Sequence, residues 1–198
     1  MEENDLRIGS IKCLGDSFVA QIKRVFDHEQ NVVWHMLTEP QALVQWLAPG
    51  SIDLRLGGVV HIDFADSGTV IDSTVLEFDP PSLLAYSWSN DDEPERRLRW
   101  ELRAVETQTQ LLLTISLPVT EDIAKACAGF DAHLEMLAAA LENVPIRFPV
   151  NYFLDRRRAY AALQQNEGNA GSDPEMPKSS IKKLASLSKK RLKIRYES

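Results

Sequence analysis

Residues 96–117 read RRLRWELRAVETQTQLLLTISL and contain two runs in which apolar and polar side chains alternate. In the first run Leu98 and Trp100 fall on one side, while arginines and a glutamate fall on the other. Successive side chains of a strand point to opposite faces of a sheet, so this pattern predicts a strand with one buried face. A polar turn at 106–108 leads to the second run, 111–117. Two strands joined by so short a turn pair antiparallel.

Other segments of the chain alternate between strand-like and helical patterns of apolar residues. Further strands are predicted at 18–26, 52–56, 60–64, 69–78 and 83–88. Helical spacing predicts two short helices between residues 27 and 48, a long helix at 120–142 and another at 151–165. We therefore expect an α+β fold in which a curved antiparallel sheet of six to seven strands wraps around a long C-terminal helix, with two short helices after the first strand.

The chain divides into three parts by composition. Residues 1–16 are polar and weakly patterned, residues 17–163 contain the predicted domain with its helical extension, and residues 164–198 are predicted to be a linker and a flexible basic tail. Eight of the 22 Lys and Arg residues of the chain lie in residues 178–198. A solvated tail is one interpretation of residues 178–195. The other is contact with an acidic partner or a membrane surface.

Composition and charge argue against several classes of protein. The 198-residue chain carries a formal net charge of −7, and its body outside the tail is acidic, so we expect it to repel the phosphate backbone of nucleic acids. No run approaches the roughly 20 apolar residues of a membrane span. The acidic N-terminus lacks the pattern of a secretory signal, and Cys13 and Cys127 indicate neither a disulfide framework nor a zinc site. We expect a cytoplasmic protein without a cofactor, and the sequence leaves the oligomeric state open.

A series of short motifs gives the chain a family resemblance. In chain order these motifs are Leu37-Thr38-Glu39-Pro40, Trp46-Leu47, Leu56-Gly57-Gly58, Glu77-Phe78-Asp79-Pro80-Pro81, Leu83-Leu84, Ser87-Trp88, Gly129-Phe130 and His133-Leu134 with Leu137. Together with the order of elements, they resemble the START-related helix-grip (SRPBCC) superfamily. The branch they resemble within it is similar to the C-terminal domain of the activator of the 90-kDa heat-shock protein ATPase. The resemblance covers residues 15–142, and residues 150–163 resemble an extension of some members.

The resemblance implies a helix-grip fold with a pocket between the concave face of the sheet and the closing helix. The superfamily includes lipid and hormone binders and aromatase/cyclases that act on polyketides. The activator that gives the branch its name is a co-chaperone with a separate N-terminal domain, for which this sequence has no counterpart. The resemblance therefore implies a fold and a pocket more directly than it implies a reaction.

We expect the pocket to lie between one face of the strands and the apolar stripe of the long helix. On the strand at 69–78, Asp72 and Thr74 are a polar pair on an otherwise apolar face, which is what orients a ligand in a pocket. Aromatic residues of the later strands can line such a cavity or simply fill the core. The predicted ligand-binding residues are Val70, Asp72, Thr74, Tyr86, Trp88, Trp100, Phe130, His133, Leu134 and Leu137.

Few titratable residues are candidates for chemistry. His61 and Asp63 share one face of a strand, and His133 lies on the helix stripe, so His61 and His133 could meet across the pocket as an acid/base pair or as metal ligands. The alternative is that the His61 face is solvated. Arg97, Arg99 and Arg103 share a strand face with Glu101, and they form either a solvated charge ladder or an anion site. The sequence has no phosphate-binding loop, nucleophile elbow or Cys/His metal motif, and we assign no catalytic or metal-binding residue.

Three functions remain open from the sequence. The first, which we favour, is a module that binds a small apolar or amphipathic ligand. The second is a cyclase- or hydrolase-type enzyme that uses pocket groups such as Asp72, His61 or His133. The third is a protein-interaction module, resembling a co-chaperone, that works through the sheet surface or the basic tail. A cavity of roughly 300 Å³ or more, reached by a titratable side chain, is compatible with the first two, whereas a filled core favours the third.

Overall fold

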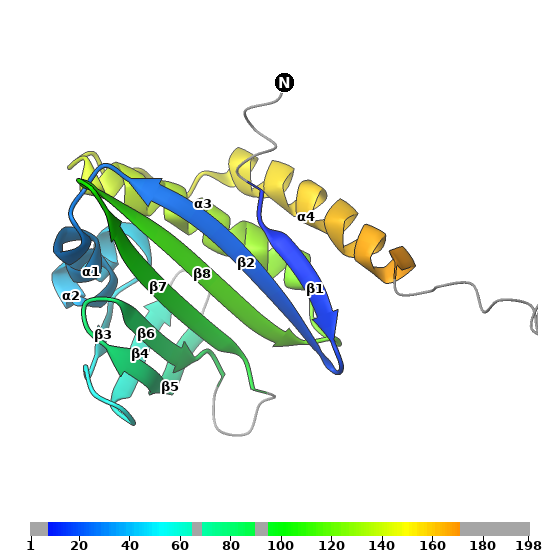
Figure 1. Cartoon of the computed structure of the whole chain (residues 1–198), viewed down its shortest axis with the longest axis horizontal. Helices are drawn as coiled ribbons and strands as arrows, with labels where there is room; N and C mark the ends of the chain where they lie inside the picture. Colours follow the sequence, from blue (N-terminus) through cyan, green and yellow to red (C-terminus); the bar gives the residue numbers. More distant parts are fainter. Residues whose placement is uncertain (1–7, 65–68, 90–94, 171–198) are drawn as a thin grey trace, which may run out of the picture. The chain divides into compact units, whose positions relative to one another are not determined.

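One antiparallel sheet of eight strands forms the framework of the part of the chain that the structure describes (Figure 1). This structure is a computed structural model, and it describes residues 8–64, 69–89 and 95–170. The strands are β1 (Ser10–Leu14), β2 (Ser17–Phe26), β3 (Gly50–Ile52), β4 (Val59–Phe64), β5 (Thr69–Asp79), β6 (Leu83–Ser87), β7 (Arg97–Val105) and β8 (Gln108–Pro118). The helices are α1 (Gln30–Thr38), α2 (Pro40–Trp46), α3 (Ile123–Leu141) and α4 (Val150–Ala170).

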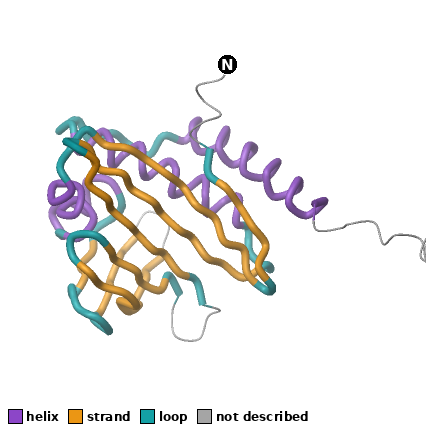
Figure 2. Tube along the Cα trace, viewed as in Figure 1, coloured by secondary structure: helices purple, strands orange, loops and turns teal. Residues whose placement is uncertain are grey.

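The α+β helix-grip architecture predicted from the sequence is confirmed. The sheet order is β1-β2-β8-β7-β6-β5-β4-β3, and α1 and α2 make the connection from β2 to the far edge at β3. The long helix α3 runs along one face of the sheet (Figure 2). The two alternating runs of residues 96–117 pair as β7 and β8, so that Trp100 lies opposite Leu113. Both side chains are buried, and the ring of Trp100 packs against Phe130 of α3, with ring centroids 6.1 Å apart.

The sheet includes a strand, β1, that apolar alternation does not predict. It lies within the N-terminal segment 1–16 and pairs with β2 through a tight turn at Gly15, whose φ of 62° suits glycine. Gly9, just before the strand, approaches β2 so closely that a Cβ there would lie 2.3 Å from the carbonyl oxygen of Gln21. In β1 itself only Ile11 is buried. A short edge strand with so few inward residues has no clear apolar alternation.

A β-bulge in β5 reverses which side chains face the core. The register of pairing with β6 shifts between Val75 and Glu77. Before the shift the odd-numbered residues from 71 to 75 are buried, whereas after it Phe78 turns inward and packs against Trp34, with ring centroids 6.2 Å apart. An extra residue in one strand of a pair changes the parity of its side chains in this way.

Because of this bulge, Val70, Asp72 and Thr74 lie on the opposite face of the sheet from the one expected. A strict two-residue period through the whole strand predicts the inner face for all three, and that placement is wrong. All three side chains are exposed on the outer face of the sheet. Asp72 pairs there with His61 of the neighbouring strand β4, with Asp72 Oδ1 and His61 Nδ1 2.6 Å apart.

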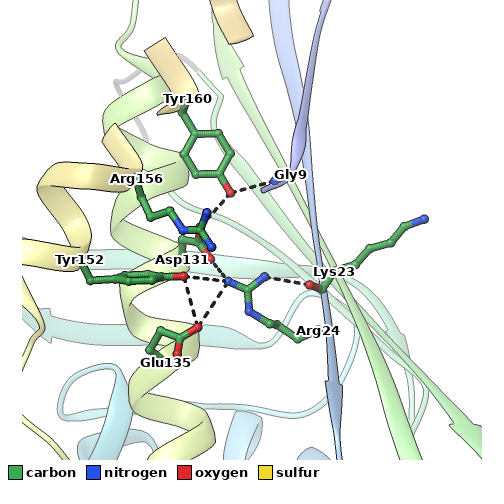
Figure 3. A network of polar contacts seen from close by, with 8 residues as sticks. All are labelled: Gly9, Lys23, Arg24, Asp131, Glu135, Tyr152, Arg156 and Tyr160. Carbon is green, nitrogen blue, oxygen red and sulfur yellow. Dashed lines mark hydrogen bonds and ion pairs between the residues drawn. The ribbon is translucent and has the colours of Figure 1, made fainter. Parts of the chain in front are cut away.

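A buried polar network holds α4 to the rest of the domain (Figure 3). At its centre is Asp131 of α3, which is fully buried and forms an ion pair with Arg24 of β2. The other carboxylate oxygen of Asp131 lies 3.2 Å from Nε of Arg156 and accepts a hydrogen bond of 3.1 Å from the hydroxyl of Tyr160. That hydroxyl accepts a hydrogen bond of 3.2 Å from the backbone N–H of Gly9. The network therefore joins α3 and α4 to the sheet and to the segment before β1.

The C-terminal helix is longer than predicted. It continues to Ala170, through the start of the expected linker at 164–198. The basic tail at 178–195 lies outside the described residues, so its predicted contact with an acidic partner or a membrane surface stays a prediction. Among the helices that the structure describes, none is long and apolar enough to cross a membrane.

Candidate ligand-binding site

A cavity of about 700 Å³ lies between the N-terminal half of α3 and the inner face of the sheet. The ends of β4, β6 and β8 and the starts of β5 and β7 contribute to it, because alternate ends of antiparallel strands meet at the same edge. Its apolar lining includes Phe64, Ile71, Trp88, Leu98, Ile115, Leu117, Phe130 and Phe153. The volume is within the range of roughly 300–1,000 Å³ that small-molecule sites occupy.

Aromatic rings form one continuous wall of the cavity. Trp88, just after β6, packs edge-to-face against Phe64 of β4, with centroids 5.5 Å apart and planes at 68°. It packs in the same way against Phe130 of α3, at 5.3 Å and 69°. Each ring in such an arrangement fixes the orientation of the next. The wall is therefore ordered, and it offers ring faces and edges to a flat or aliphatic molecule.

The face of α3 that lines the cavity carries Ala126, Gly129, Phe130 and His133. Their spacing of three, four and seven residues places them on one side of a helix. Two of the four are small. Apart from the two neighbouring residues and the adjoining backbone of α3, no atom of the described residues lies within 4 Å of the position that a Cβ of Gly129 would take. The room for a ligand therefore arises partly from missing side-chain volume on α3.

His133 is a mostly buried titratable group on the cavity wall. Its Nδ1 lies 2.8 Å from the backbone carbonyl oxygen of Trp46. Trp46 is the last residue of α2, and the final carbonyls of a helix have no partner within the helix. Burial lowers the pKa of His133, and the hydrogen bond to Trp46 opposes this only in part. The imidazole is therefore neutral at physiological pH.

Charged residues lie at the rim of the cavity. Nε of Arg96 donates to both carboxylate oxygens of Glu121, at 3.0 and 2.8 Å. Asp122 caps α3 by accepting a 2.8 Å hydrogen bond from the backbone N–H of Lys125, and it pairs with Arg157 of α4 at 2.8 Å. Partial burial raises the pKa of Asp122, but these partners outweigh it and hold the pKa below its usual value. The rim thus stays ionised and polar above an apolar interior.

The predicted ligand-binding residues separate into three groups in the structure. Those that line the cavity are Trp88, Phe130 and His133. Those that are buried in the core outside the cavity lining are Tyr86, Trp100, Leu134 and Leu137. Those on the outer face of the sheet are Val70, Asp72 and Thr74. Burial raises the pKa of Tyr86, so its phenol stays neutral. Binding of a ligand by any of them stays a prediction.

The two candidate histidines do not meet. His61 lies on the outer face of β4 beside Asp72, whereas His133 lines the cavity on the other side of the sheet. Of the two readings of this strand face, the structure supports the solvated one, because the exposed His61 alternates with the buried Val60 and Ile62. The same outer face carries the arginines of β7, and Nε of Arg99 lies 3.3 Å from Oε1 of Glu77 on the neighbouring part of the sheet.

The structure also bears on nucleophiles and metals. Cys127 of α3 is buried, and burial raises the pKa of its thiol to about 12, so the reactive thiolate is scarce. In the described ranges, no group of three or more His, Cys, Asp or Glu side chains is placed to hold a metal ion.

Several residues of the site were not found from the sequence. Phe64 and Phe153 line the cavity although they lie on β4 and α4. Nothing in the sequence near Phe153 indicates that α4 folds back to this site. A usable signal existed on α3, where Ala126 and Gly129 precede Phe130 and His133 at helical spacing. Small residues in a helix stripe that faces a sheet indicate space rather than packing.

Comparison with known families and structures agrees with this fold. Residues 27–142 match the family described as Activator of Hsp90 ATPase homolog 1-like protein, which covers more than half of the chain. No curated protein sequence matches the chain.

Among solved structures, CalU16 from Micromonospora echinospora is similar with 21% sequence identity and a TM-score of 0.66, over 79% of this chain and 96% of that chain. The conserved protein EF2215 from Enterococcus faecalis, whose function is unknown, has 19% identity and a TM-score of 0.69, over 80% of this chain and 91% of that one. DynU16, from the dynemicin biosynthetic locus, has 25% identity and a TM-score of 0.59, over 64% of this chain and 48% of that one.

Proposed function

Since the chain belongs to the family of Activator of Hsp90 ATPase homolog 1-like proteins, we propose that it binds one small apolar or amphipathic molecule in the cavity beside α3. The observation that carries this proposal is an ordered aromatic wall around about 700 Å³ of space.

The contrast between cavity and core supports this function. Behind the cavity, the rings of Trp46 and Trp100 pack at 5.8 Å, and both are 1% exposed. Protein interiors are packed as densely as organic crystals, and large voids cost contacts and stability. A domain that packs its core this closely could fill the space at Gly129 with a larger side chain. The space therefore supports a role in binding.

The distribution of charge favours an amphipathic ligand. The interior is lined by Phe64, Trp88 and Phe130, whereas Lys125 and Asp122 are exposed at the rim. An apolar body inside the cavity would leave a polar or charged end beside these rim groups. Sites for small molecules combine an apolar lining with a few polar groups in this way.

The alternative of cyclase- or hydrolase-type chemistry has weaker support. Of the three groups considered for it, His61 and Asp72 lie on the outer face of the sheet, and only His133 reaches the cavity. His133 is neutral and already bonded to the end of α2, and the acidic side chains of the lining, Glu121 and Asp122, lie at the rim in ion pairs with arginines. We therefore propose binding without conversion of the ligand.

Native mass spectrometry of protein purified from its own host tests whether a molecule is retained. A direct binding assay can use 8-anilinonaphthalene-1-sulfonate, which combines apolar rings with an anionic group. The variant Gly129→Leu places a side chain in the cavity, and we expect it to weaken binding of this probe at least tenfold while unfolding stays cooperative.

The matched control is Ala162→Leu, which adds the same side chain at an exposed position of α4. Its affinity for the probe should equal that of the unmodified protein. Equal affinities for all three proteins would show that the probe binds elsewhere and would contradict the proposal.

A further inference from the structure

We propose that His133 selects ligands that carry a hydrogen-bond donor, a hydroxyl or an N–H, on an apolar ring system. This inference rests on the proposed function and assigns a chemical class to the ligand. It follows from the way the ring of His133 is held, from what surrounds it and from its place in the cavity.

The tautomer of His133 is fixed by its partner. Nδ1 lies 2.8 Å from the carbonyl oxygen of Trp46, and a carbonyl can only accept a hydrogen bond. Nδ1 must therefore carry the proton. A neutral imidazole has one N–H, so Nε2 is left with a lone pair and acts as an acceptor.

The fold fixes this arrangement at a second point. Trp46 is itself held in place, because its indole N–H donates to the carbonyl oxygen of Met36 at 2.7 Å. Rotating the ring of His133 to exchange its nitrogens would break its bond and leave the end of α2 without a partner. The acceptor at Nε2 is thus a consequence of how α2 ends against α3.

Nε2 has no polar partner among the described residues, and its neighbours are apolar rings. The ring of His133 lies 6.1 Å from that of Phe64 and 5.3 Å from that of Phe148, measured between centroids. Once a ligand covers Nε2, a polar atom in such surroundings costs free energy unless a hydrogen-bond partner reaches it. In a filled cavity that partner is a donor on the ligand.

The same acceptor disfavours acidic groups at this position. A carboxylate has lone pairs only, so its oxygen would repel the lone pair of Nε2. A protonated ring would remove this repulsion, but burial lowers the pKa of His133 and disfavours protonation. An anionic group of the ligand is better placed at the rim near Lys125. The expected ligand therefore has its donor inside and any negative charge outside.

The test compares 2-naphthol with 2-methoxynaphthalene, which differ in the ability to donate a hydrogen bond. The unmodified protein should bind 2-naphthol about threefold to tenfold more tightly, in line with one additional neutral hydrogen bond. In the variant His133→Asn, the side-chain amide can keep the bond to Trp46 but has no acceptor at the Nε2 position. We expect its ratio of dissociation constants to fall to about one.

The control Phe148→Leu changes a neighbour of the ring and keeps the acceptor. It should weaken both probes alike and preserve the ratio. A second readout needs no variant: in ¹⁵N-resolved NMR spectra, Nε2 of His133 should resonate as an unprotonated nitrogen and shift when 2-naphthol binds, and not when 2-methoxynaphthalene binds.

The outcomes separate the two proposals. If neither naphthalene binds the unmodified protein in the cavity, the proposed function fails and the selectivity fails with it. If both bind with equal affinity, or if His133→Asn keeps the preference, or if Nε2 carries the proton, only the inference about His133 is overturned.

Discussion

Asp131 and His133 lie two residues apart on α3, and the fold treats these two polar groups in opposite ways. Asp131 is fully buried and has several partners, among them Arg24, Arg156 and Tyr160. His133 has one hydrogen bond to the protein, and its other ring nitrogen has none in the described part of the chain. A buried group whose bonding capacity is filled by the protein supports the structure, whereas one left half-filled beside a cavity is available for recognition.

The side of α3 that bears Asp131 joins parts of the chain distant in sequence. Figure 3 shows Arg24 and Arg156 approaching the carboxylate from β2 and α4, with Tyr152 and Glu135 beside them. The hydroxyl of Tyr152 donates to Glu135 at 3.3 Å. These contacts position α4, and α4 in turn carries Phe153 into the lining of the cavity. The side of α3 that bears Asp131 thus supports the cavity through α4, although Asp131 itself does not line the cavity.

The largest effect is expected from Asp131→Asn. This change removes the charge of Asp131 from beside Arg24 and Arg156, whose side chains are 9% and 6% exposed, although Arg24 keeps Glu135 at 3.6 Å. Breaking a buried pair from one side typically costs about 3–5 kcal/mol in the free energy of unfolding. Urea denaturation measures this loss, and the control Asp155→Asn, at an exposed pair on α4, should change stability by less than about 0.5 kcal/mol.

The same variant also tests whether the side of α3 that bears Asp131 and the side that lines the cavity act independently. Where Asp131→Asn is still folded with α4 in place, its affinity for 2-naphthol should equal that of the unmodified protein. A stability within about 1 kcal/mol of the unmodified protein would contradict the structural role of Asp131. Loss of binding by the folded variant would show that the two sides of α3 are not separable.

A smaller effect is expected from pH. Because the pKa of His133 is lowered in the folded protein, both states are neutral at this residue above about pH 6.5, where its contribution to stability is complete. As the pH falls below that value the unfolded state binds the proton first, so the free energy of unfolding decreases, by at most about 1.4 kcal/mol per pH unit. Between about pH 8 and pH 5, the free energy of unfolding should decrease less steeply in His133→Asn than in the unmodified protein.

The exposed His35 provides the control for this measurement. In His35→Asn the slope should remain that of the unmodified protein. An identical slope in His133→Asn and the unmodified protein would mean that His133 is as accessible to protons in the folded state as in the unfolded state, and the contrast with Asp131 would lose its basis.

The smallest effect is expected on the outer face of the sheet. His61→Ala removes one partner of Asp72, but both side chains are about half exposed or more, at 47% and 68%. Exposed ion pairs contribute little, so the change in stability should stay within about 0.5 kcal/mol and the affinity for 2-naphthol should not change. A loss of binding in this variant would indicate that the probe binds at the outer face of the sheet, which would contradict the proposed cavity site.

The sequence predicts the architecture because its apolar periods are strong. The alternation through Leu98 and Trp100 specifies a buried face of β7, and the elements on either side follow the same rule. The two-residue period fails where pairing with another strand determines which way a side chain points. The bulge between Val75 and Glu77 is set by pairing with β6, and nothing in β5 alone marks it.

The candidate site is predicted only in part, for a similar reason. Trp88, Phe130 and His133 follow from local patterns, but Phe153 depends on how α4 returns to the domain. The buried network could have been anticipated from Arg24, which shares the inward face of β2 with apolar residues, since an inward arginine needs an acidic partner. Which acidic residue of the chain would supply that partner depends on the tertiary structure.

The bulge in β5 has a further consequence for how this binding site can vary between sequences. It divides the strand into two segments, and the parity of the inward residues in one segment does not fix the parity in the other. One segment contains Ile71 at the cavity, and the other contains Phe78 against Trp34. Deletion of one residue at the bulge would restore a continuous ladder and exchange the faces of one segment relative to the other. A single insertion or deletion, rather than several substitutions, is then enough to bring a carboxylate such as Asp72 to the cavity wall.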